Sequence, residues 1–297
     1  MLKTSLDRIL DGTNSVNINE IFDLAKNESV KKASEDQKKV LFLGVDIQND
    51  FMDDGALGVP GAYEDVKRVN QFIYNNIDKI TNIAVSLDTH HTNQVFHPEW
   101  WVDESGNHPE PLTIISAEDV EKGVWRAVNY EEESLDYVRN LEKTGQKQLC
   151  IWPYHCIEGT PGHSLESQFA QMIYFHSAVR KSPIKMIVKG KDPLSEMYGI
   201  IKPEYSADDQ TDYDLLKYVK QFDQIVVAGE AESHCVYESV KQIADYYADD
   251  KDFTSSIYVL KDGTSCITGF EEVSKEGWSQ LQEQYGINIV DSHEIKL

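Results

Sequence analysis

The sequence predicts an α/β protein of three layers, a doubly wound fold in which a mostly parallel sheet of about six strands carries helices on both faces. Three observations predict it. Short apolar runs alternate along the chain with segments of helical spacing. The runs are apolar at almost every position, as is typical of parallel strands buried on both faces. A residue capable of chemistry lies at or just past the end of five runs, where open sheets of this kind bind their ligands.

Seven runs of the chain are interpreted as strands because they are short, apolar and bounded by turn residues. In chain order they are 39–46, 82–88, 147–152, 185–188, 225–228, 256–260 and the more weakly marked 287–290. The first two, KVLFLGVD and NIAVSLD, both end in an aspartate. The fifth is broken at once by Gly229, so a tight turn is expected there.

Five segments between these runs carry apolar residues at helical spacing. In chain order they are 66–80, 131–141, 165–179, a segment that starts near Cys235, and 270–285. Each lies between two expected strands, and this alternation implies a parallel sheet covered on both faces.

Two stretches fall outside this alternation. Residues 1–38 are polar with one or two amphipathic patterns, and we interpret them as a helical extension that packs on the domain or on a partner. A partly disordered arm is the alternative. Residues 39–297 then form one domain, with an insertion at about 98–146 that is rich in tryptophan and acts as a lid or as a contact between copies of the chain in a homo-oligomer.

Composition narrows the classes of partner. The chain has 28 basic and 51 acidic residues, a formal net charge of -23, which argues against nucleic acid and anionic membranes. No apolar run is long enough to span a bilayer, and the N-terminus lacks the apolar core of a secretory signal. We therefore expect a cytoplasmic protein with a small-molecule substrate, in which the four cysteines are thiols.

The chemistry-bearing residues that follow the strands include a thiol, a carboxyl group and an amine. Cys235 lies at the start of an expected helix, where backbone N–H groups and the helix dipole stabilise a thiolate. Asp46 could accept the thiol proton, and Lys189 could hold the geometry. The alternatives are a structural buried cysteine and a structural Asp46–Lys189 ion pair.

A second group of residues suits a metal ion. The candidate ligands are Asp88, His90, His97 and His155. Three imidazoles and a carboxylate suit one divalent ion, with Zn²⁺ favoured and Fe²⁺ or Mn²⁺ as alternatives. His91 and Cys156 are weaker candidates because each adjoins a better one. The alternative is a histidine cluster that binds nothing.

Five motifs, taken in order, resemble those of the isochorismatase-like cysteine hydrolases, and within them the nicotinamidases. They are VDIQNDF at 45–51, DTH at 88–90 with His97, WPYHC at 152–156 with GTPG at 159–162, VKG at 188–190, and GEAESHCV at 229–236. The resemblance runs from about Lys39 to the C-terminus. It implies the isochorismatase-like hydrolase fold for this part of the chain.

The resemblance also implies roles for particular residues. Cys235 would be the nucleophile, Asp46 the catalytic base and Lys189 the catalytic lysine. A cis peptide bond would precede Ala231, and the backbone amides of Ala231 and Cys235 would form the oxyanion hole.

For the substrate, the resemblance implies a ring held between aromatic walls and a metal ion. The walls would be Phe51, Trp152 and, less firmly, Tyr198; core packing is the alternative for each. The implied function is a metal-dependent cysteine amidohydrolase, a nicotinamidase that makes nicotinate and ammonia for NAD salvage. The alternatives are a related amidase or ureide hydrolase with another substrate, and an inactive member used for binding.

The nucleophile motif departs from the family pattern. Glu230, Glu232 and Ser233 stand where apolar, threonine and aspartate residues are more usual. Acidic side chains would raise the pKa of the Cys235 thiol if they faced it. They could instead point away, or reflect a different substrate.

Overall fold

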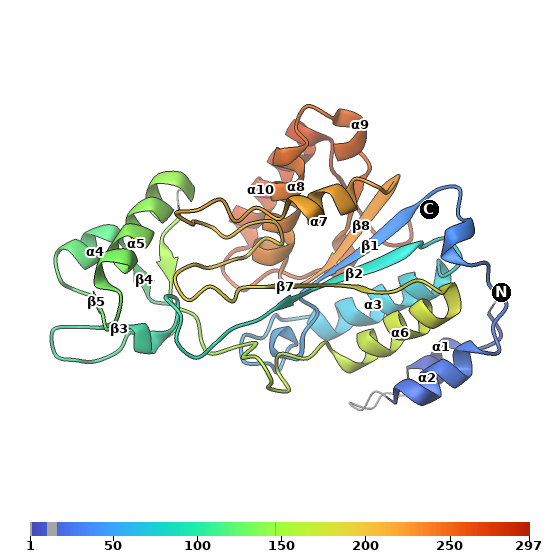
Figure 1. Ribbon diagram of the computed structural model, residues 1–297, viewed down its shortest axis with the longest axis horizontal. Helices are drawn as coiled ribbons and strands as arrows, with labels where there is room; N and C mark the ends of the chain where they lie inside the picture. The colour runs from blue at the N-terminus through green and yellow to red at the C-terminus, as the bar shows by residue number, and fades with distance from the viewer. Residues whose placement is uncertain (1, 11–16, 146) are drawn as a thin grey trace.

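The computed structural model, which describes residues 2–10, 17–145 and 147–297, has a six-stranded sheet as its middle layer (Figure 1). Its strands are β1 (Val40–Val45), β2 (Asn82–Asp88), β7 (Lys185–Lys189), β8 (Gln224–Gly229), β9 (Ile257–Leu260) and β10 (Asn288–Val290). They are ordered β10-β9-β8-β1-β2-β7, and every neighbouring pair is parallel. The predicted parallel sheet is therefore confirmed.

Helices cover both faces of this sheet, as predicted. One face carries α3 (Ala62–Asn75) and α6 (Ser167–Arg180); the other carries α7 (Tyr213–Val219), α8 (Tyr237–Tyr246), the short α9 (Lys251–Thr254) and α10 (Glu271–Tyr285). Strand β1 shows why the core has two halves: Phe42 packs with α3 and α6, whereas Leu41 and Leu43 pack with the opposite layer. Among the described helices, none is long and apolar enough to cross a membrane.

The N-terminal residues pack beside α6. The elements there are α1 (Leu6–Ile9), α2 (Ile18–Ala25) and the 3₁₀ turn η1 (Ala33–Glu35). Ile9 and Ile21 are buried in the same apolar cluster as α6. At the end of α6, the fully buried Arg180 forms an ion pair with Asp36 and donates to the carbonyl of Lys31. Residues 1 and 11–16 of the predicted extension lie outside the described residues, and its boundary with the domain at 38/39 stays a prediction.

The predicted insertion has a small core of its own, beyond the end of the main sheet (Figure 1). Its elements are η3 (Pro98–Trp100), β3 (Trp101–Val102), β4 (Ile114–Ile115), α4 (Ala117–Glu121), β5 (Arg126–Ala127) and α5 (Glu131–Gly145). Strand β3 pairs with β5, and the buried Trp100 and Trp101 fill the core. Residue 146 lies outside the described residues.

One predicted strand belongs elsewhere. The run 147–152 contributes only β6 (Leu149–Cys150), which pairs antiparallel with β4 in the insertion. The place beside β2 in the central sheet is taken by β7, and 287–290 joins as β10. The central sheet therefore has six strands, but the run 147–152 is not one of them and the weakly marked run 287–290 is.

Candidate active site

Four adjacent strands, β8, β1, β2 and β7, bring the predicted catalytic residues to one edge of the sheet. Asp46 follows β1, Asp88 ends β2, Lys189 ends β7, and Cys235 comes six residues after β8. All four are buried. These side chains can meet only if the strands are in a register that aligns their ends. The pairing of Asp88 with Lys189 across β2 and β7 shows such a register.

The Lys189 ammonium group is the centre of the site. Its Nζ lies 2.9 Å from Asp46 Oδ2, 3.0 Å from Asp88 Oδ1 and 3.6 Å from Cys235 Sγ. It also donates to the carbonyl of Met197 at 2.9 Å. A single cation therefore joins the sulfur and both carboxyl groups.

Burial and charge set the protonation of these groups. Burial favours the neutral amine, but Asp46 and Asp88 raise the pKa of Lys189 well above its ordinary value. Burial raises the pKa of Asp46, against the attraction of Lys189. Burial would also raise the pKa of Asp88, but His90 and Lys189 together hold it well below the ordinary value. Lys189 is thus a fixed cation, and Asp46 is the carboxyl group readier to take a proton.

The environment of Cys235 favours the protonated form of its thiol. Burial raises its pKa well above the ordinary value; Lys189 opposes the shift, and the charges of Asp46 and Asp88 add to it. The thiol also hydrogen-bonds to Asp46. The Asp46 carboxyl group is therefore already in contact with the thiol.

Asp46 is held by its neighbour on β2. The Ser86 hydroxyl donates to Asp46 Oδ1 at 2.5 Å, and the backbone N–H of Asp46 donates to the same hydroxyl at 3.0 Å. Asp46 adopts a φ of 47°, a left-handed conformation that aspartate tolerates better than most residues. These contacts fix its carboxyl group beside Lys189.

The segment after β8 positions Cys235. A cis peptide bond joins Glu230 to Ala231, as the family resemblance implied. Gly229 has a φ of 128°, and a Cβ there would lie 2.0 Å from the carbonyl oxygen of Val45. Only glycine lets β8 end so close to β1. A single π-helical turn, η4 (Glu232–Val236), then carries Cys235 into the start of α8.

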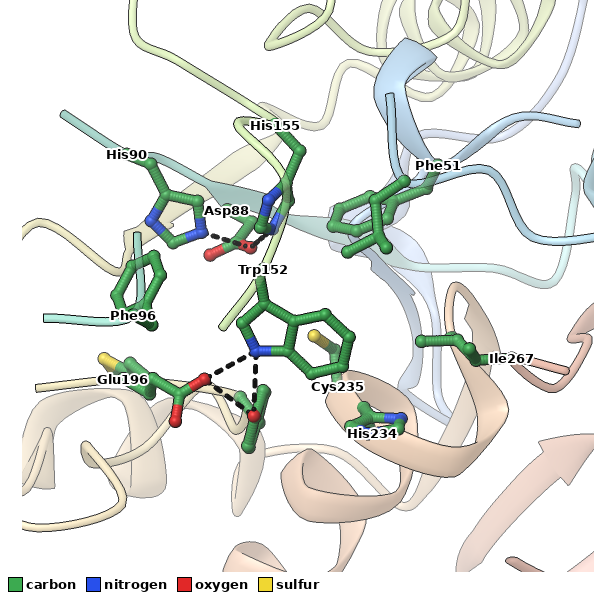
Figure 2. Close-up of a pocket in the computed structure, with 14 residues that line it drawn as sticks. Phe51, Asp88, His90, Phe96, Trp152, His155, Glu196, His234, Cys235 and Ile267 are labelled. Atoms are coloured by element: carbon green, nitrogen blue, oxygen red, sulfur yellow. Dashed lines mark hydrogen bonds and ion pairs between the residues drawn. The ribbon is translucent and has the colours of Figure 1, made fainter. Parts of the chain in front are cut away.

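Three of the predicted metal ligands converge. The donor atoms of Asp88, His90 and His155 lie within 4.8 Å of one another. The Nε2 atoms of His90 and His155 lie 2.8 and 3.5 Å from Asp88 Oδ2, and Figure 2 shows both rings directed at this carboxyl group. The Nδ1 atoms of the two rings contact the carbonyls of Gly190 and Pro153 at 3.2 and 2.8 Å.

Those carbonyl contacts test whether a cation fits. A carbonyl accepts a hydrogen bond from Nδ1–H, and in the tautomer that makes this bond Nε2 is bare and faces Asp88. Lone pairs of His90, His155 and a carboxylate then face one another. A divalent cation between them satisfies all three, so the residues fit a metal ion.

His97 lies next to this group but outside it. Its ring is fully buried and 6.1 Å, centroid to centroid, from that of His90. Burial, with smaller contributions from His90 and His155, lowers the pKa of His97 to about 3. Within the described part of the chain, neither ring nitrogen of His97 has a hydrogen-bond partner. A buried neutral imidazole with no partner suits a fourth ligand, which stays a prediction.

A pocket opens between the thiol and the metal-ligand group, and Figure 2 shows its lining. The three predicted wall residues, Phe51, Trp152 and Tyr198, all line it. Further lining comes from Leu57, Phe96, Glu196, Met197, Ala231, His234 and Ile267. The site therefore combines mostly apolar walls with a few convergent polar groups, as small-ligand sites do.

Comparison with known proteins gives matches among solved structures only. No protein-family model and no curated protein matches the sequence. A yeast nicotinamidase bound to the inhibitor nicotinaldehyde is 20% identical, with a TM-score of 0.59 over 85% of this chain and 99% of that one. A nicotinamidase/pyrazinamidase of Acinetobacter baumanii is also 20% identical, with a TM-score of 0.58 over 88% and 99%. A Pyrococcus horikoshii pyrazinamidase in complex with zinc is 20% identical, with a TM-score of 0.50 over 85% and 98%.

The chain has the isochorismatase-like hydrolase fold. The resemblance proposed from the five motifs is thereby confirmed at the level of the fold, and the match extends over most of the chain. At these identities the substrate of this chain has to be argued from its own residues.

Within this isochorismatase-like fold, two residues of the pocket wall, Glu196 and His234, were not predicted from the sequence. Glu196 is buried in the pocket wall, where its Oε1 accepts hydrogen bonds from Trp152 Nε1 and the Tyr198 hydroxyl, each at 2.7 Å. Burial raises the pKa of Glu196 to about 7. His234 lines the pocket, and its ring centroid lies 5.6 Å from that of Trp152. A single Glu or His in a loop offers no pattern that could have found either.

The structure also shows the contacts of the weaker metal-ligand candidates and of the two unusual glutamates in the nucleophile motif. His91 pairs with Glu158 at the surface. Cys156 is buried, but its sulfur does not belong to the group of converging ligand atoms. The Glu232 side chain accepts from the Ser274 hydroxyl on α10, and Glu230 contacts Ser265. The side chains of Glu230 and Glu232 thus hydrogen-bond to Ser265 and Ser274 rather than to Cys235.

Proposed function

We propose that the protein is a metal-dependent cysteine amidohydrolase that converts nicotinamide and water to nicotinate and ammonia. One observation carries the proposal: Lys189 Nζ contacts Cys235 Sγ, Asp46 and Asp88 at once, so a nucleophile, a base and a metal-ligand group meet around one cation. A nicotinate-forming reaction of this kind would serve NAD salvage.

In the first half of the reaction, the Cys235 sulfur attacks the amide carbonyl carbon, and its proton passes to Asp46. The S–C bond forms as the C=O bond becomes a C–O⁻ bond. The backbone amides of Ala231, just before η4, and of Cys235, within η4, would hold that oxyanion. The tetrahedral centre then collapses, the C–N bond breaks, and Asp46 gives the proton to the departing amine, which leaves as ammonia.

In the second half, a water molecule takes the place of ammonia. Asp46 accepts a proton from it, and the oxygen attacks the thioester carbonyl. The C–S bond breaks, the carboxylate product leaves, and the sulfur regains a proton. The raised pKa of Asp46 suits this alternation, because a group that must both accept and donate a proton works best when its pKa lies near the operating pH. Lys189 keeps its charge throughout and holds Asp46 beside the sulfur.

The substrate assignment rests on the pocket walls. Phe51, Trp152 and Tyr198 present aromatic surface to a flat ring. Asp88, His90 and His155 would hold the metal ion, with His97 as the proposed fourth ligand, and the ion when bound supplies a Lewis acid for the pyridine nitrogen. Zinc is supported by the Pyrococcus horikoshii pyrazinamidase, which is in complex with zinc. The yeast nicotinamidase bound to nicotinaldehyde supports a pyridine ring as the ligand.

The test is release of ammonia from nicotinamide by the purified protein loaded with zinc. Wild type is expected to release ammonia, and Cys235→Ala to lose at least about 10⁴-fold in kcat. Cys150→Ala, which removes a buried thiol on β6, is the matched control and should keep kcat within about twofold. A strong chelator should abolish turnover, and added zinc should restore it.

Other outcomes separate the alternatives. Hydrolysis of another small amide or a ureide, but not of nicotinamide, would indicate the related hydrolase. No hydrolysis of any amide, together with no preferential alkylation of Cys235, would indicate a binding protein and contradict the proposal.

A further inference from the structure

Glu230 precedes Ala231, whose amide belongs to the proposed oxyanion hole. Its backbone N–H donates to the carbonyl of Val45 at 2.9 Å, so this residue ties the end of β8 to the end of β1. The side chain is buried, with 1% of its surface exposed. It is not among the residues that line the pocket. A buried acid at this point requires a partner.

The partners of Glu230 lie on two other segments. Its Oε2 accepts from the backbone N–H of Ser265 at 3.3 Å, and its carboxyl group hydrogen-bonds to that of Asp65 on α3. Asp65 is also buried, accepts from the Ser265 hydroxyl, and forms an ion pair with Arg68 at 3.2 Å. Two carboxyl groups can hydrogen-bond to each other only if one keeps its proton. The pair therefore shares a proton in the folded protein.

Burial and charge act on both carboxyl groups of the pair. Burial raises the pKa of Glu230 well above its ordinary value, and the charge of Asp65 raises it further. Burial also raises the pKa of Asp65, but Ser265, Glu230 and Arg68 favour its charged form. The other charged groups that act on the pair are Asp53 on the Glu230 side and Asp262 on the Asp65 side, and both disfavour a second negative charge.

Ser265 contacts the chain on both sides of Ala231. Its N–H donates to the Glu230 carboxyl group, and its carbonyl accepts from the N–H of Glu232 at 2.8 Å. Two residues further on, Ile267 lines the pocket. The carboxyl pair and Ser265 thus bracket Ala231, one of the two residues whose amides would hold the oxyanion.

We propose that Glu230 is a positioning residue, whose buried carboxyl group, bonded to Asp65 and Ser265, fixes the Ala231 amide for transition-state stabilisation. This inference rests on the proposed function. Loss of the shared proton at high pH would place two negative charges side by side in a buried site and release the Ala231 segment. Turnover then has an alkaline limit set by this pair, which lies outside the substrate pocket.

The experiment compares Glu230→Ala, Glu230→Gln and Glu232→Gln with wild type. Glutamine can donate to Asp65 and accept from Ser265 without titrating, so E230Q should keep kcat within about threefold at pH 7. E230A should lose about tenfold or more in kcat with KM within about twofold, since the contact at risk acts in the transition state. The alkaline limb of kcat should move to higher pH in E230Q. E232Q, the matched control, should leave that limb unchanged.

Thermal unfolding gives a readout that needs no substrate. A carboxyl group with a raised folded pKa contributes stability at low pH that is lost as pH rises through that pKa. The Tm of wild type should therefore fall more steeply than that of E230Q between pH 5 and 9. Parallel Tm curves, a shared alkaline limb, or equal losses in E230Q and E230A would each overturn the proposal. Wild type that hydrolyses no amide but shows the steeper Tm curve would overturn the amidase assignment and leave the carboxyl pair established.

Discussion

Replacing Lys189 by methionine tests the electrostatic centre of the site. The change keeps most of the side-chain volume and removes a fully buried charge. Asp46 and Asp88, which lie 2.9 and 3.0 Å from Lys189 Nζ, lose their shared cation. Breaking a buried ion pair on one side costs roughly 3–5 kcal/mol. At about 2–3 °C per kcal/mol for a chain of this size, we expect Tm to fall by about 6–15 °C at pH 8 with a chelator present.

The loss of Tm in K189M should be larger at high pH than at low pH. Without Lys189, the folded pKa values of Asp46 and Asp88 rise. Acids with raised folded pKa values contribute stability below their unfolded pKa, and that stability is lost as pH rises through the folded pKa. The difference in Tm between wild type and K189M should therefore be smaller at pH 5.5 than at pH 8.

The assay is differential scanning calorimetry with two comparison variants. Lys241→Met breaks a contact with Asp245 in which the side chains are 39% and 42% exposed, so its effect should stay within about 0.5 kcal/mol. Adding Asp46→Asn to K189M removes one of the two stranded charges and should recover part of the lost Tm. A loss in K189M no larger than in K241M, or no recovery in the double variant, would refute the assignment of Lys189 as the shared counter-ion.

Three further predictions concern the rest of the molecule. His155→Ala and His97→Ala should each weaken zinc binding about tenfold or more in competition with a chromophoric chelator; unchanged affinity in H97A would remove His97 from the ligand set. Because burial raises the pKa of Glu196 to about 7, wild type should lose about 2–3 kcal/mol relative to E196Q as pH rises from 5 to 8, and urea unfolding at both pH values checks this. Asp36→Ala leaves the fully buried Arg180 without its ion-pair partner and should lower the unfolding free energy by about 3 kcal/mol. A change below about 1 kcal/mol would show that this ion pair does not hold the N-terminal extension on the domain.

The central sheet could be predicted because its signals are local. Runs such as VLFLGV are apolar at every position, and the residue that follows a parallel strand has a known place at the sheet edge. Asp46, Asp88, Lys189 and Cys235 were all placed in this way. The strand 147–152 was assigned wrongly because its partner, Ile114–Ile115, is too short to leave a pattern.

The features that could not be predicted depend on contacts distant in sequence. The raised pKa of Glu196 depends on burial beside Trp152, which is 44 residues away in sequence and meets Glu196 only in the folded chain. The direction of the Glu230 side chain is set by Asp65, on a helix far away in sequence. Residue types reveal that a group can titrate, but its pKa depends on neighbours that the fold supplies.

The charge of the site leads to a last prediction, which concerns the thiol. With both acids ionised, Asp46, Asp88 and Lys189 carry one net negative charge beside Cys235, and burial together with these acids raises the pKa of the thiol. A divalent cation at Asp88 would reverse the sign of that charge and should lower the pKa of Cys235. We therefore expect iodoacetamide to alkylate Cys235 about tenfold faster at pH 7 in zinc-loaded protein than in chelated protein, since each pKa unit changes the thiolate fraction tenfold. The half-buried Cys266 reports general accessibility in the same samples, and its rate should not change. Equal rates at Cys235 with and without zinc would mean that the metal-ligand group and the nucleophile are not electrostatically coupled.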